Sequence, residues 1–422
     1  MNEAFLWYLW KYRLFTKALV TTDGDPITVI QPGFQNSDSG PDFFNARVQI
    51  GDTLWAGNVE IHIKSGDWIR HGHHHDRAFD NVILHVVFEE DRIIRRPNGQ
   101  VIPVVTIGDN FEPSRWANYQ QLARSKGWIP CEKQINEIDE LSILQWLDRL
   151  LVDRLEAKTS TIMDLLTESN GDWQETFYRL LARNFGFKVN AIPFELLAKS
   201  LPLKILLRHK NNLFQLEALL LGQAGLLAPD FVDPYPRQLY HEYIYLQKKL
   251  LIKPLEGHLW KFGRLRPANF PTIRLMQFAT LIHKSEHLFL NIIDASSIEE
   301  LHRLLTVSAG EYWNTHFRPD QYSAFQVKSL GASAIENILI NTIVPFLFMY
   351  GKSQGHPALI EKSIKWLETC KAEKNVIIRG WEKLGITAKS AAQSQSLIEL
   401  KNNYCLPKNC LTCGIGIKLF NK

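Results

Sequence analysis

The chain has 422 residues, a formal net charge of +4 and 45% hydrophobic residues. This length suffices for two or three domains, and the composition is that of a soluble globular protein. The net charge is too small to predict nucleic-acid binding by itself, although it does not oppose such binding.

Two features of the sequence predict a cytoplasmic protein without a membrane segment. The N-terminus carries Glu3 where a signal peptide would have a basic region, and no small-residue cleavage site follows. The longest apolar run, from Ile338 to Tyr350, is too short for a membrane span and contains Asn341 and Pro345. In the cytoplasm, cysteines favour metal chemistry over disulfides.

A small α/β region is predicted for residues 1–112. Apolar residues between Phe5 and Leu14 favour an opening helix. Runs of β-branched and aromatic residues, mostly separated by turn residues, then predict strands at 27–31, 43–50, 53–64, 82–88 and 101–107. Between the third and fourth of these strands, the segment HGHHHDRAFD is long enough for one or two helical turns.

Beyond Glu112 the hydrophobic period becomes that of helices. Apolar residues from Ile143 to Leu155 recur at three- and four-residue steps, with charged residues on the other faces. Similar patterns predict helices at 173–185, 213–227, 239–251, 271–293, 297–306, 333–349 and 357–371. The expected fold class is α+β, with an α/β domain at 1–112, a large all-α domain at 113–400 and a short cysteine-rich tail at 401–422.

Polar residues on two neighbouring predicted strands indicate a catalytic site. Asp42 follows a Gly-Pro turn, whereas Glu60, His62 and Lys64 alternate with isoleucines on the next long strand. Because alternate side chains share one face of a strand, a carboxylate, an imidazole and an ammonium would lie together. Asp42 and Glu60 could bind Mg²⁺ or Mn²⁺, and His62 or Lys64 could position or deprotonate water. The same spacing also fits a half-buried strand whose polar side faces water.

The order of helix, three strands, short helical crossover and strand resembles the core of the PD-(D/E)xK phosphodiesterase superfamily. This resemblance covers residues 1–110 and implies an αβββαβ nuclease-type core. Asp42 matches the aspartate of the second core strand, and Glu60 matches the second acid on the third strand. Glu3 would be the acid that the first helix sometimes supplies. The sequence departs from the pattern because His62 stands where lysine is expected, and Lys64 follows two residues later.

The wider sequence resembles an uncharacterised bacterial family known only as a domain of unknown function. Three stretches carry this resemblance, which covers nearly the whole chain: SGPDFFNARVQIGDTLWAGNVEIHIKSGDWIRHGH, NVILHVVFEED and NYCLPKNCLTC. It implies no activity.

Four histidines follow the predicted catalytic strand directly. His71, His73, His74 and His75 lie near Asp76 and Asp80, and imidazoles beside carboxylates suit Zn, Ni, Mn or Fe. His71 and His73 are therefore candidate ligands of the same metal as Asp42 and Glu60. The alternative is an exposed loop that happens to be rich in histidine. His85, inside an apolar strand, is interpreted as a core histidine.

Three cysteines lie close together near the C-terminus. Cys405, Cys410 and Cys413 could bind one zinc ion or, alternatively, an iron–sulfur cluster. Either group needs a fourth ligand, for which Cys131 and Cys370 are the candidates. Iron–sulfur members of the PD-(D/E)xK superfamily use one distant cysteine and a C-terminal trio, a resemblance that draws attention to Cys131. The alternative is three unconnected thiols.

The segment GRLRPANFPTIR places three arginines around an aromatic residue. Arg264, Arg266 and Arg274 could contact phosphates, and Phe270 could stack on a base. A structural connector between helices, with its arginines paired to local acids, is the competing interpretation.

Three functions follow from these patterns. The first is a metal-dependent nucleic-acid phosphodiesterase with DNA or RNA as its candidate partner. The second is a non-catalytic nucleic-acid-binding or scaffold protein with a degenerate nuclease core. The third is a histidine-cluster metalloenzyme that acts on a small molecule. The sequence contains no pattern that predicts the oligomeric state.

Overall fold

The computed structural model of the chain describes residues 1–36 and 38–421, so that Lys422, in the predicted tail, lies outside the described part. The chain forms two compact units. The first unit contains Met1–Trp146 and the chain from Leu400 onward, and the second contains Leu147–Glu399. The chain therefore leaves the first unit within helix α4 (Glu140–Glu168) and returns after helix α17 (Ala391–Glu399). The second unit ends within one residue of the predicted boundary after residue 400, whereas the first unit extends past the predicted boundary after residue 112 and includes the C-terminal segment.

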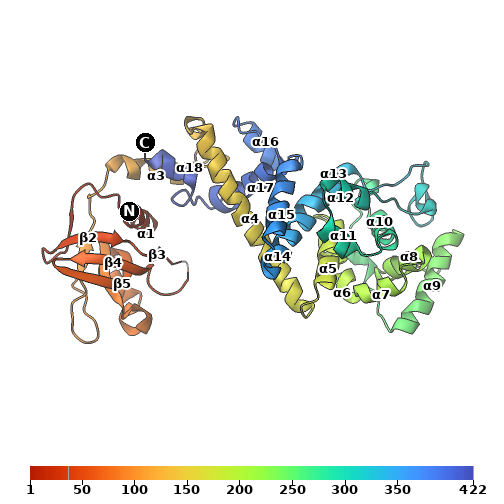
Figure 1. Cartoon of the computed structure of the whole chain (residues 1–422), viewed down its shortest axis with the longest axis horizontal. Helices are drawn as coiled ribbons and strands as arrows, with labels where there is room; N and C mark the ends of the chain where they lie inside the picture. The colour runs from red at the N-terminus through yellow and green to blue at the C-terminus, as the bar shows by residue number, and fades with distance from the viewer. Residues whose placement is uncertain (37, 422) are drawn as a thin grey trace. The chain divides into compact units, whose positions relative to one another are not determined.

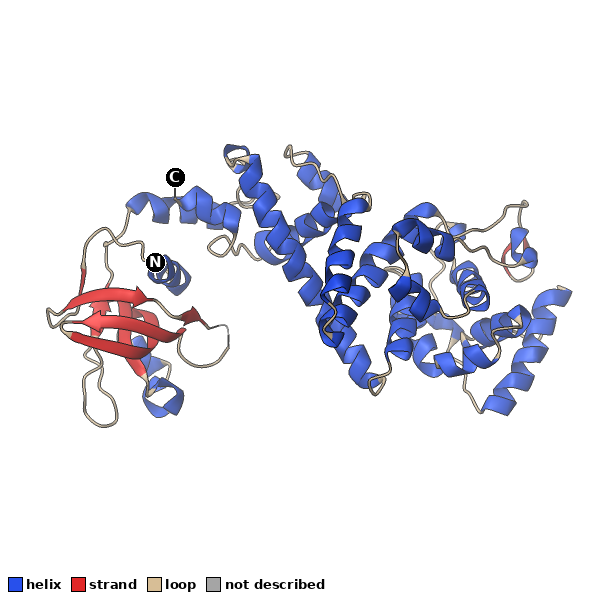
Figure 2. Ribbon diagram, in the orientation of Figure 1, coloured by secondary structure: helices blue, strands red, loops and turns tan. Residues whose placement is uncertain are grey.

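The first unit is built on a seven-stranded sheet with the order β1-β2-β4-β5-β6-β7, in which β3 pairs with β4 (Figure 2). The strands are β1 (Leu19–Val20), β2 (Pro26–Gln31), β3 (Phe34–Gln35), β4 (Phe43–Ile50), β5 (Thr53–Lys64), β6 (Val82–Glu89) and β7 (Val104–Thr106). Strands β2, β4 and β5 are antiparallel neighbours, whereas β6 runs parallel to β5, and β7 runs parallel to β6. The predicted strands thus agree closely with the structure.

The connection between β5 and β6 has to cross over the sheet, because parallel neighbours cannot be joined by a tight hairpin. It contains three short helices: α2 (Asp67–Arg70), η1 (His73–His75) and η2 (Arg77–Phe79). The histidine-rich segment of the sequence is therefore this crossover, which begins directly at the end of β5.

Helix α1 (Glu3–Tyr12) contacts β5, and its residues Phe5 and Leu9 are fully buried (Figure 1). Helices α3 (Pro113–Arg124) and α18 (Gly414–Phe420) contact each other. The ring of Phe5 lies 4.9 Å from that of Trp116, and the ring of Tyr8 lies 5.7 Å from that of Phe420. These aromatic contacts explain why residues beyond 112 and the C-terminal segment belong to the first unit. Short helices η3 (Ile135–Glu137) and η8 (Leu400–Cys405) complete it.

The second unit is helical and includes a small hairpin of β8 (His316–Arg318) and β9 (Gln321–Tyr322). Its longer helices are α5 (Trp173–Phe185), α6 (Ala191–Ser200), α8 (Leu213–Gln223), α9 (Pro234–Leu250), α10 (Pro271–Lys284), α12 (Ile298–Leu305), α14 (Val344–Gln354) and α15 (Pro357–Thr369). The shorter ones are α7 (Leu203–Arg208), η4 (Gly257–Leu259), η5 (Pro267–Asn269), α11 (Leu288–Asp294), η6 (Glu311–Asn314), α13 (Ala332–Ile338), η7 (Leu339–Ile343) and α16 (Val376–Glu382). A mixed α+β fold with an N-terminal sheet and a large helical region is thereby confirmed.

Among the described residues, one helical segment is long and apolar enough to cross a membrane, judged by length and composition alone. It runs from Ala332 to Gln354 through α13, η7 and α14, but 72% of its most apolar window is buried inside the structure. Such burial is typical of the core helix of a folded domain. The π-helical turn η7 precedes Pro345, which fits the usual association of helix irregularities with proline.

Candidate metal centre

The pairing of β5 with β6 places three polar residues on one face of the sheet. Glu60 lies opposite His85 in the parallel register, and His62 follows Glu60 by two positions. All three residues are buried, with exposures of 4% for Glu60, 2% for His62 and 0% for His85. The amphipathic-strand alternative required this polar side to face water. The burial therefore contradicts that alternative.

The structure brings Asp42 and Glu60 together at the adjoining ends of β4 and β5. The backbone N–H of Asp42 donates to Glu60 Oε2 at 3.1 Å, and the backbone N–H of Ile61 donates to Asp42 Oδ2 at 2.9 Å. The Trp7 indole of helix α1 also donates to Asp42 Oδ2 at 3.1 Å. Each carboxylate is thus oriented by the backbone of the strand that carries the other one.

The histidines form a cluster beside the second oxygen of Glu60. His62 Nε2 lies 3.4 Å and His73 Nε2 lies 3.2 Å from Glu60 Oε1. His62 Nε2 also lies 3.1 Å from His71 Nδ1. One ring nitrogen from each of His62, His71 and His73 forms a group in which all atoms lie within 4.8 Å of one another. We call Glu60, His62, His71 and His73 the histidine centre.

The crossover selects which of its histidines join the centre. The ring of His73 stacks on Phe79, with centroids 3.8 Å apart, and contacts Trp68 at 5.5 Å. Both aromatic residues are buried, so they hold His73 against the sheet. His74 and His75 instead pack against each other, with ring centroids 3.8 Å apart.

The electrostatic environment favours uncharged imidazoles and disfavours paired anions. Burial, together with His85, His73 and His71, lowers the pKa of His62 to about 2, and burial lowers the pKa of His85 to about 3. Burial and the nearby Glu60 raise the pKa of Asp42 to about 8. His62 is therefore neutral over the whole ordinary pH range, which a metal ligand requires.

Glu3 is part of the same electrostatic neighbourhood. Burial raises the pKa of Glu3, with Asp67 and Glu60 adding to the shift and His71 opposing it. Helix α1 therefore places an acid near the histidine centre, where the sequence suggested that it would assist.

The donor atoms of the histidine centre fit a divalent metal. His73 Nε2 is buried and makes no hydrogen bond, although it lies 3.2 Å from Glu60 Oε1. Ligand atoms about 2.1 Å from one cation lie about 3.0–3.4 Å from one another in octahedral or tetrahedral geometry, which matches the spacings here. His62 Nδ1 lies 2.9 Å from His85 Nε2. A proton on His62 Nδ1 would thus be shared with His85 and would leave Nε2 free for a metal.

Two cations near the site differ from the sequence-based expectation. Lys64 extends to Glu89 of β6, with Nζ 3.6 Å from Oε2, and its side chain is 49% exposed. Arg70 of helix α2 pairs with Asp67 at 2.8 Å, and its positive charge acts on both His62 and Glu3. Arg70, and not Lys64, is therefore the cation whose charge acts on His62 and Glu3.

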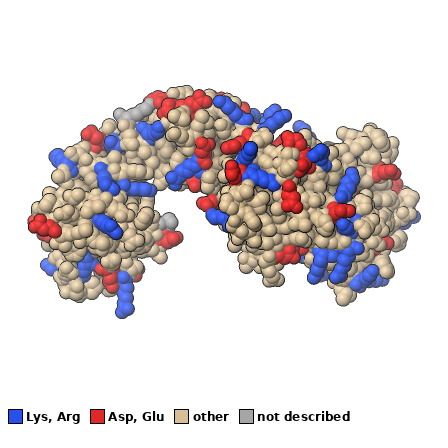
Figure 3. Space-filling view, in the orientation of Figure 1, with Lys and Arg blue, Asp and Glu red and all other residues tan. Residues whose placement is uncertain are grey.

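The three arginines of the predicted nucleic-acid segment lie in the second unit and differ in exposure. Arg274 is buried, donates to Gln277 and Asn269, and lies over the ring of Phe187. Its guanidinium therefore holds helix α10 to neighbouring segments, and the nucleic-acid role predicted for it stays a prediction. Arg264 and Arg266 are exposed. On the face shown in Figure 3, basic and acidic side chains are interspersed over much of the surface.

The predicted cysteine trio lies in the first unit, where it adjoins Cys131, whereas Cys370 lies in the second. All five cysteines are buried and none forms a disulfide. Among the described residues, the sulfurs are spaced more widely than the ring nitrogens of the histidine centre, since no three of them lie within 4.8 Å of one another.

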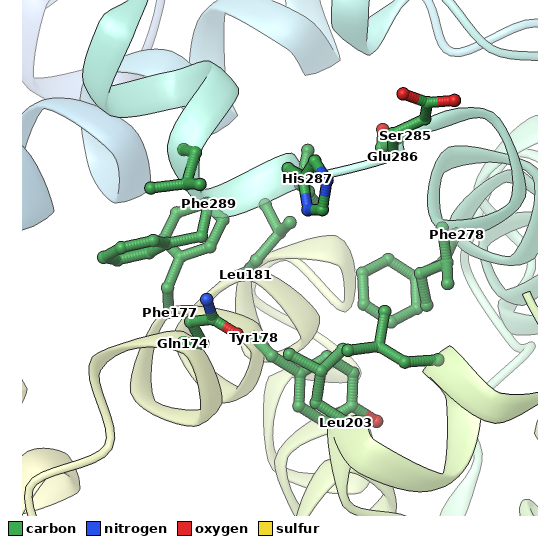
Figure 4. A pocket seen from close by; sticks show the side chains of 14 residues that line it. Gln174, Phe177, Tyr178, Leu181, Leu203, Phe278, Ser285, Glu286, His287 and Phe289 are labelled. Atoms are coloured by element: carbon green, nitrogen blue, oxygen red, sulfur yellow. The ribbon is translucent and has the colours of Figure 1, made fainter.

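The second unit contains an apolar pocket with room for about 70 Å³, lined mainly by side chains of α5, α10 and α11 (Figure 4). The aromatic side chains that line it include those of Phe177, Tyr178, Phe278 and Phe289, which Figure 4 labels. Glu286 and His287 also line it, but no cluster of metal-binding groups accompanies them among the described residues. The pocket therefore has fewer side chains that could bind a metal than the histidine centre has.

Three residues that contact Asp42 or His62, or act on them electrostatically, were not assigned to the site from sequence. Trp7 lies four positions after Glu3, so both occupy one face of α1, and this spacing was the available signal. His85 was interpreted as a core histidine, and it is buried as expected, yet it contacts His62. Arg70 carries no pattern of its own that distinguishes it from other surface arginines.

Comparison with known proteins gives one match. A family model described as "Protein of unknown function (DUF2851)" matches residues 3–376. No curated protein and no solved structure shows a significant match.

Proposed function

We propose that this chain, which belongs to the DUF2851 family of proteins of unknown function, is a metal-dependent phosphodiesterase that acts on nucleic acid. The observation that carries the proposal is the approach of His62 Nε2 and His73 Nε2 to the same oxygen of Glu60, at 3.4 and 3.2 Å. Two imidazole nitrogens and a carboxylate oxygen that converge on one point form the ligand set of a divalent metal.

The topology of the first unit supports phosphodiesters as the substrate class. The first unit contains, in chain order, helix α1, the antiparallel strands β2, β4 and β5, the crossover and the parallel strand β6. This is the order expected from the resemblance to the PD-(D/E)xK core, and it supports the proposal. Asp42 and Glu60 occupy the two positions that this resemblance assigns to metal-binding acids. One fold supports many chemistries, so the proposal rests mainly on the residues of the site.

The donor set favours Mn²⁺ or Zn²⁺ over the Mg²⁺ that two carboxylates alone would suit. Mg²⁺ prefers oxygen ligands in octahedral geometry, whereas imidazoles suit zinc and iron, and the carboxylate of Glu60 suits Mn²⁺. Glu60, His62 and His73 would hold the ion, with His71 as a further ligand. When bound, the ion would act as a Lewis acid toward the phosphodiester and the attacking water.

The surrounding residues would orient the reacting groups. Asp42 is fixed by Trp7 and the backbone of Ile61, so its carboxylate is held beside Glu60 at the edge of the centre. Its raised pKa, caused by burial and by Glu60, suits a group that holds a proton near neutral pH. Arg70 is 70% exposed and close enough to act on His62, so it could orient an anionic substrate at the mouth of the centre.

A second function, hydrolysis of a small molecule, is favoured by the predominance of histidine in the ligand set. Three imidazoles and one carboxylate are not specific for nucleic acid. These groups can provide the metal binding and proton transfer that many hydrolytic reactions require. Assays with a small phosphodiester, such as bis(4-nitrophenyl) phosphate, separate this function from one that needs a polymer.

The experiment is an assay of the full chain on single- and double-stranded DNA, on RNA and on the small phosphodiester, with Mg²⁺, Mn²⁺ or Zn²⁺. We expect hydrolysis with Mn²⁺ or Zn²⁺ that is lost in His73→Ala and retained in His75→Ala, a histidine outside the centre. Metal binding at the centre without hydrolysis of any phosphodiester would contradict the proposal and support the non-catalytic alternative. Hydrolysis that survives in His73→Ala would place the activity elsewhere.

A further inference from the structure

Four buried cysteines gather in the first unit, although they come from two distant parts of the sequence. Cys131 follows α3, whereas Cys405, Cys410 and Cys413 lie near the C-terminus. Two lysines of the C-terminal segment donate to backbone carbonyls shortly before Cys131, and the thiols also influence one another's pKa. Burial raises the pKa of Cys131 to about 12, and charge on Cys413 and Cys410 contributes to this shift. Burial also raises the pKa of Cys405, with Cys413, Cys131 and Cys410 contributing.

Contacts of the backbone and of two lysines hold these segments together. The ammonium of Lys401 lies 4.6 Å from the ring centre of Trp128 and donates to the carbonyl of that residue. Lys408 donates through its ammonium to the carbonyl of Ala123 at 2.7 Å. The C-terminal segment therefore lies against the chain on the N-terminal side of Cys131, which explains how the fourth thiol comes near the trio.

The turn that contains the trio has the features of a metal-binding knuckle. The N–H of Lys408 donates to the carbonyl of Cys405 at 3.2 Å, and the N–H of Cys413 donates to that of Cys410 at 3.3 Å. Backbone N–H groups of Ile415 and Gly416 point to the Cys413 thiol and partly offset the rise in its pKa. A side chain at Gly416 would overlap the carbonyl of Cys410. The turn is thus closed tightly, with N–H donors directed at a sulfur.

We propose that Cys131, Cys405, Cys410 and Cys413 bind one zinc ion through four thiolates and thereby fasten the C-terminal segment to the first unit. Four sulfurs complete the tetrahedral coordination of a structural zinc site. A cation also removes the mutual repulsion that the deprotonated thiols would otherwise have. Cys370 is excluded because it lies in the second unit, where Glu336 is its charged neighbour. The sulfurs move closer together when the ion binds, since zinc–sulfur bonds are about 2.3 Å long.

The first test is elemental analysis of the purified full chain and of its variants. We expect Cys410→Ser and Cys131→Ser to contain about one zinc ion per chain less than the wild type, following the one-ion stoichiometry of a closed four-thiolate site. Cys370→Ser, a buried cysteine outside the cluster, is the matched control and should keep the wild-type zinc content. His73→Ala should also keep the zinc bound to the cysteines, so that the two metal sites are counted separately.

A second measurement does not depend on the folding of the variants. Replacement of the metal by Co²⁺ in the wild-type chain should produce the thiolate-to-cobalt charge-transfer absorption and the intense visible bands of tetrahedral thiolate coordination. Wild-type protein without these bands would overturn the proposal. Equal zinc contents in the wild type, Cys131→Ser and Cys410→Ser would also overturn it, as would iron with acid-labile sulfide at these cysteines in place of zinc.

Discussion

Two groups of residues in the first unit differ in how closely their candidate ligand atoms lie before a metal binds. They are the histidine centre and the cysteine cluster, which consists of Cys131, Cys405, Cys410 and Cys413. In the histidine centre, nitrogens of His62, His71 and His73 already lie within 4.8 Å of one another. The pKa of His62 is lowered by burial and neighbouring imidazoles to about 2, so that residue needs no deprotonation. In the cysteine cluster, burial raises the pKa of Cys131 and Cys410 to about 12, and the sulfurs are spaced more widely.

In the proposed catalytic site, the protein holds the ligand atoms in place before a metal binds. In the proposed structural site, the metal itself would bring the ligand atoms together. A site held in place by the sheet and by Phe79 can exchange its metal and keep its geometry. A thiolate site that forms only with its ion contributes the binding free energy to folding. Chelation should therefore remove activity before it loosens the C-terminal segment.

The largest expected effect is that of removing the charge at the histidine centre. Glu60→Gln keeps the shape of the side chain but removes the anion that His62 and His73 approach. We expect a loss of at least ~100-fold in Mn²⁺ affinity and in phosphodiester hydrolysis, because a ligand should matter at least as much as its supporting residues. Calorimetric titration with Mn²⁺ and the hydrolysis assay measure the two quantities. An affinity within about twofold of the wild type would remove Glu60 from the ligand set, since loss of a true ligand costs far more.

Glu217 in the second unit is a buried acid away from both proposed metal sites, and its ionisation should affect stability alone. Burial raises its pKa to about 7, and the hydroxyl of Tyr235 donates to Glu217 Oε2 at 2.5 Å. Because the folded pKa exceeds the ordinary value of 4.5, its contribution to stability is present below about pH 4.5 and is lost as pH rises through about 7. Glu217→Gln keeps an acceptor but cannot ionise.

Between pH 4.5 and pH 8, the free energy of unfolding of the wild type should decrease by about 3 kcal/mol more than that of Glu217→Gln. Denaturant titrations of both proteins at several pH values measure this difference. Their metal contents should be the same. Parallel pH profiles would show that Glu217 does not titrate in this range.

His85 tests the support of the histidine centre. His85→Phe removes the partner that lies 2.9 Å from His62 Nδ1 and leaves the imidazole free to rotate or change its tautomer. We expect metal affinity to fall about 10–100-fold, as is usual when a residue supporting a ligand is lost. His85→Gln can still accept a hydrogen bond and should recover part of the affinity. Equal losses in both variants would indicate a packing role alone.

The smallest effect is expected at Lys64. Its ammonium pairs with Glu89 at an exposed position, and such pairs contribute about 0.2–1 kcal/mol. Lys64→Met should therefore change hydrolysis and Mn²⁺ affinity less than about twofold, because an exposed pair of this kind contributes little. Arg70→Met, which removes the cation near His62, should raise KM for an anionic substrate more than Lys64→Met does. The reverse order would return the water-positioning role to Lys64.

The strands were predictable because turn residues separate them and because their apolar residues alternate. Gly51 and Asp52 join β4 to β5 in an antiparallel pair, so the approach of Asp42 to Glu60 follows from strand order alone. The course of the crossover does not follow from such local patterns. Only the packing of His73 on Phe79 and Trp68 shows which histidines face Glu60.

The remaining differences arise from contacts between residues distant in sequence. Lys64 shares a face with Glu60, but its position at the end of β5 brings it beside Glu89 of β6. The boundary predicted after residue 112 followed a change of period, yet Trp116 packs on Phe5 and keeps α3 with the sheet. Composition carries no signal for either contact.

The most direct test of the histidine centre is a crystal of the full chain grown with Mn²⁺ and examined by anomalous diffraction. We expect a peak about 2.0–2.3 Å from Glu60 Oε1, His62 Nε2 and His73 Nε2, at the bond lengths usual for such ligands. The peak should be absent in Glu60→Gln crystals under the same conditions. Wild-type crystals with Mn²⁺ bound only elsewhere, or with no peak among these residues, would contradict the account.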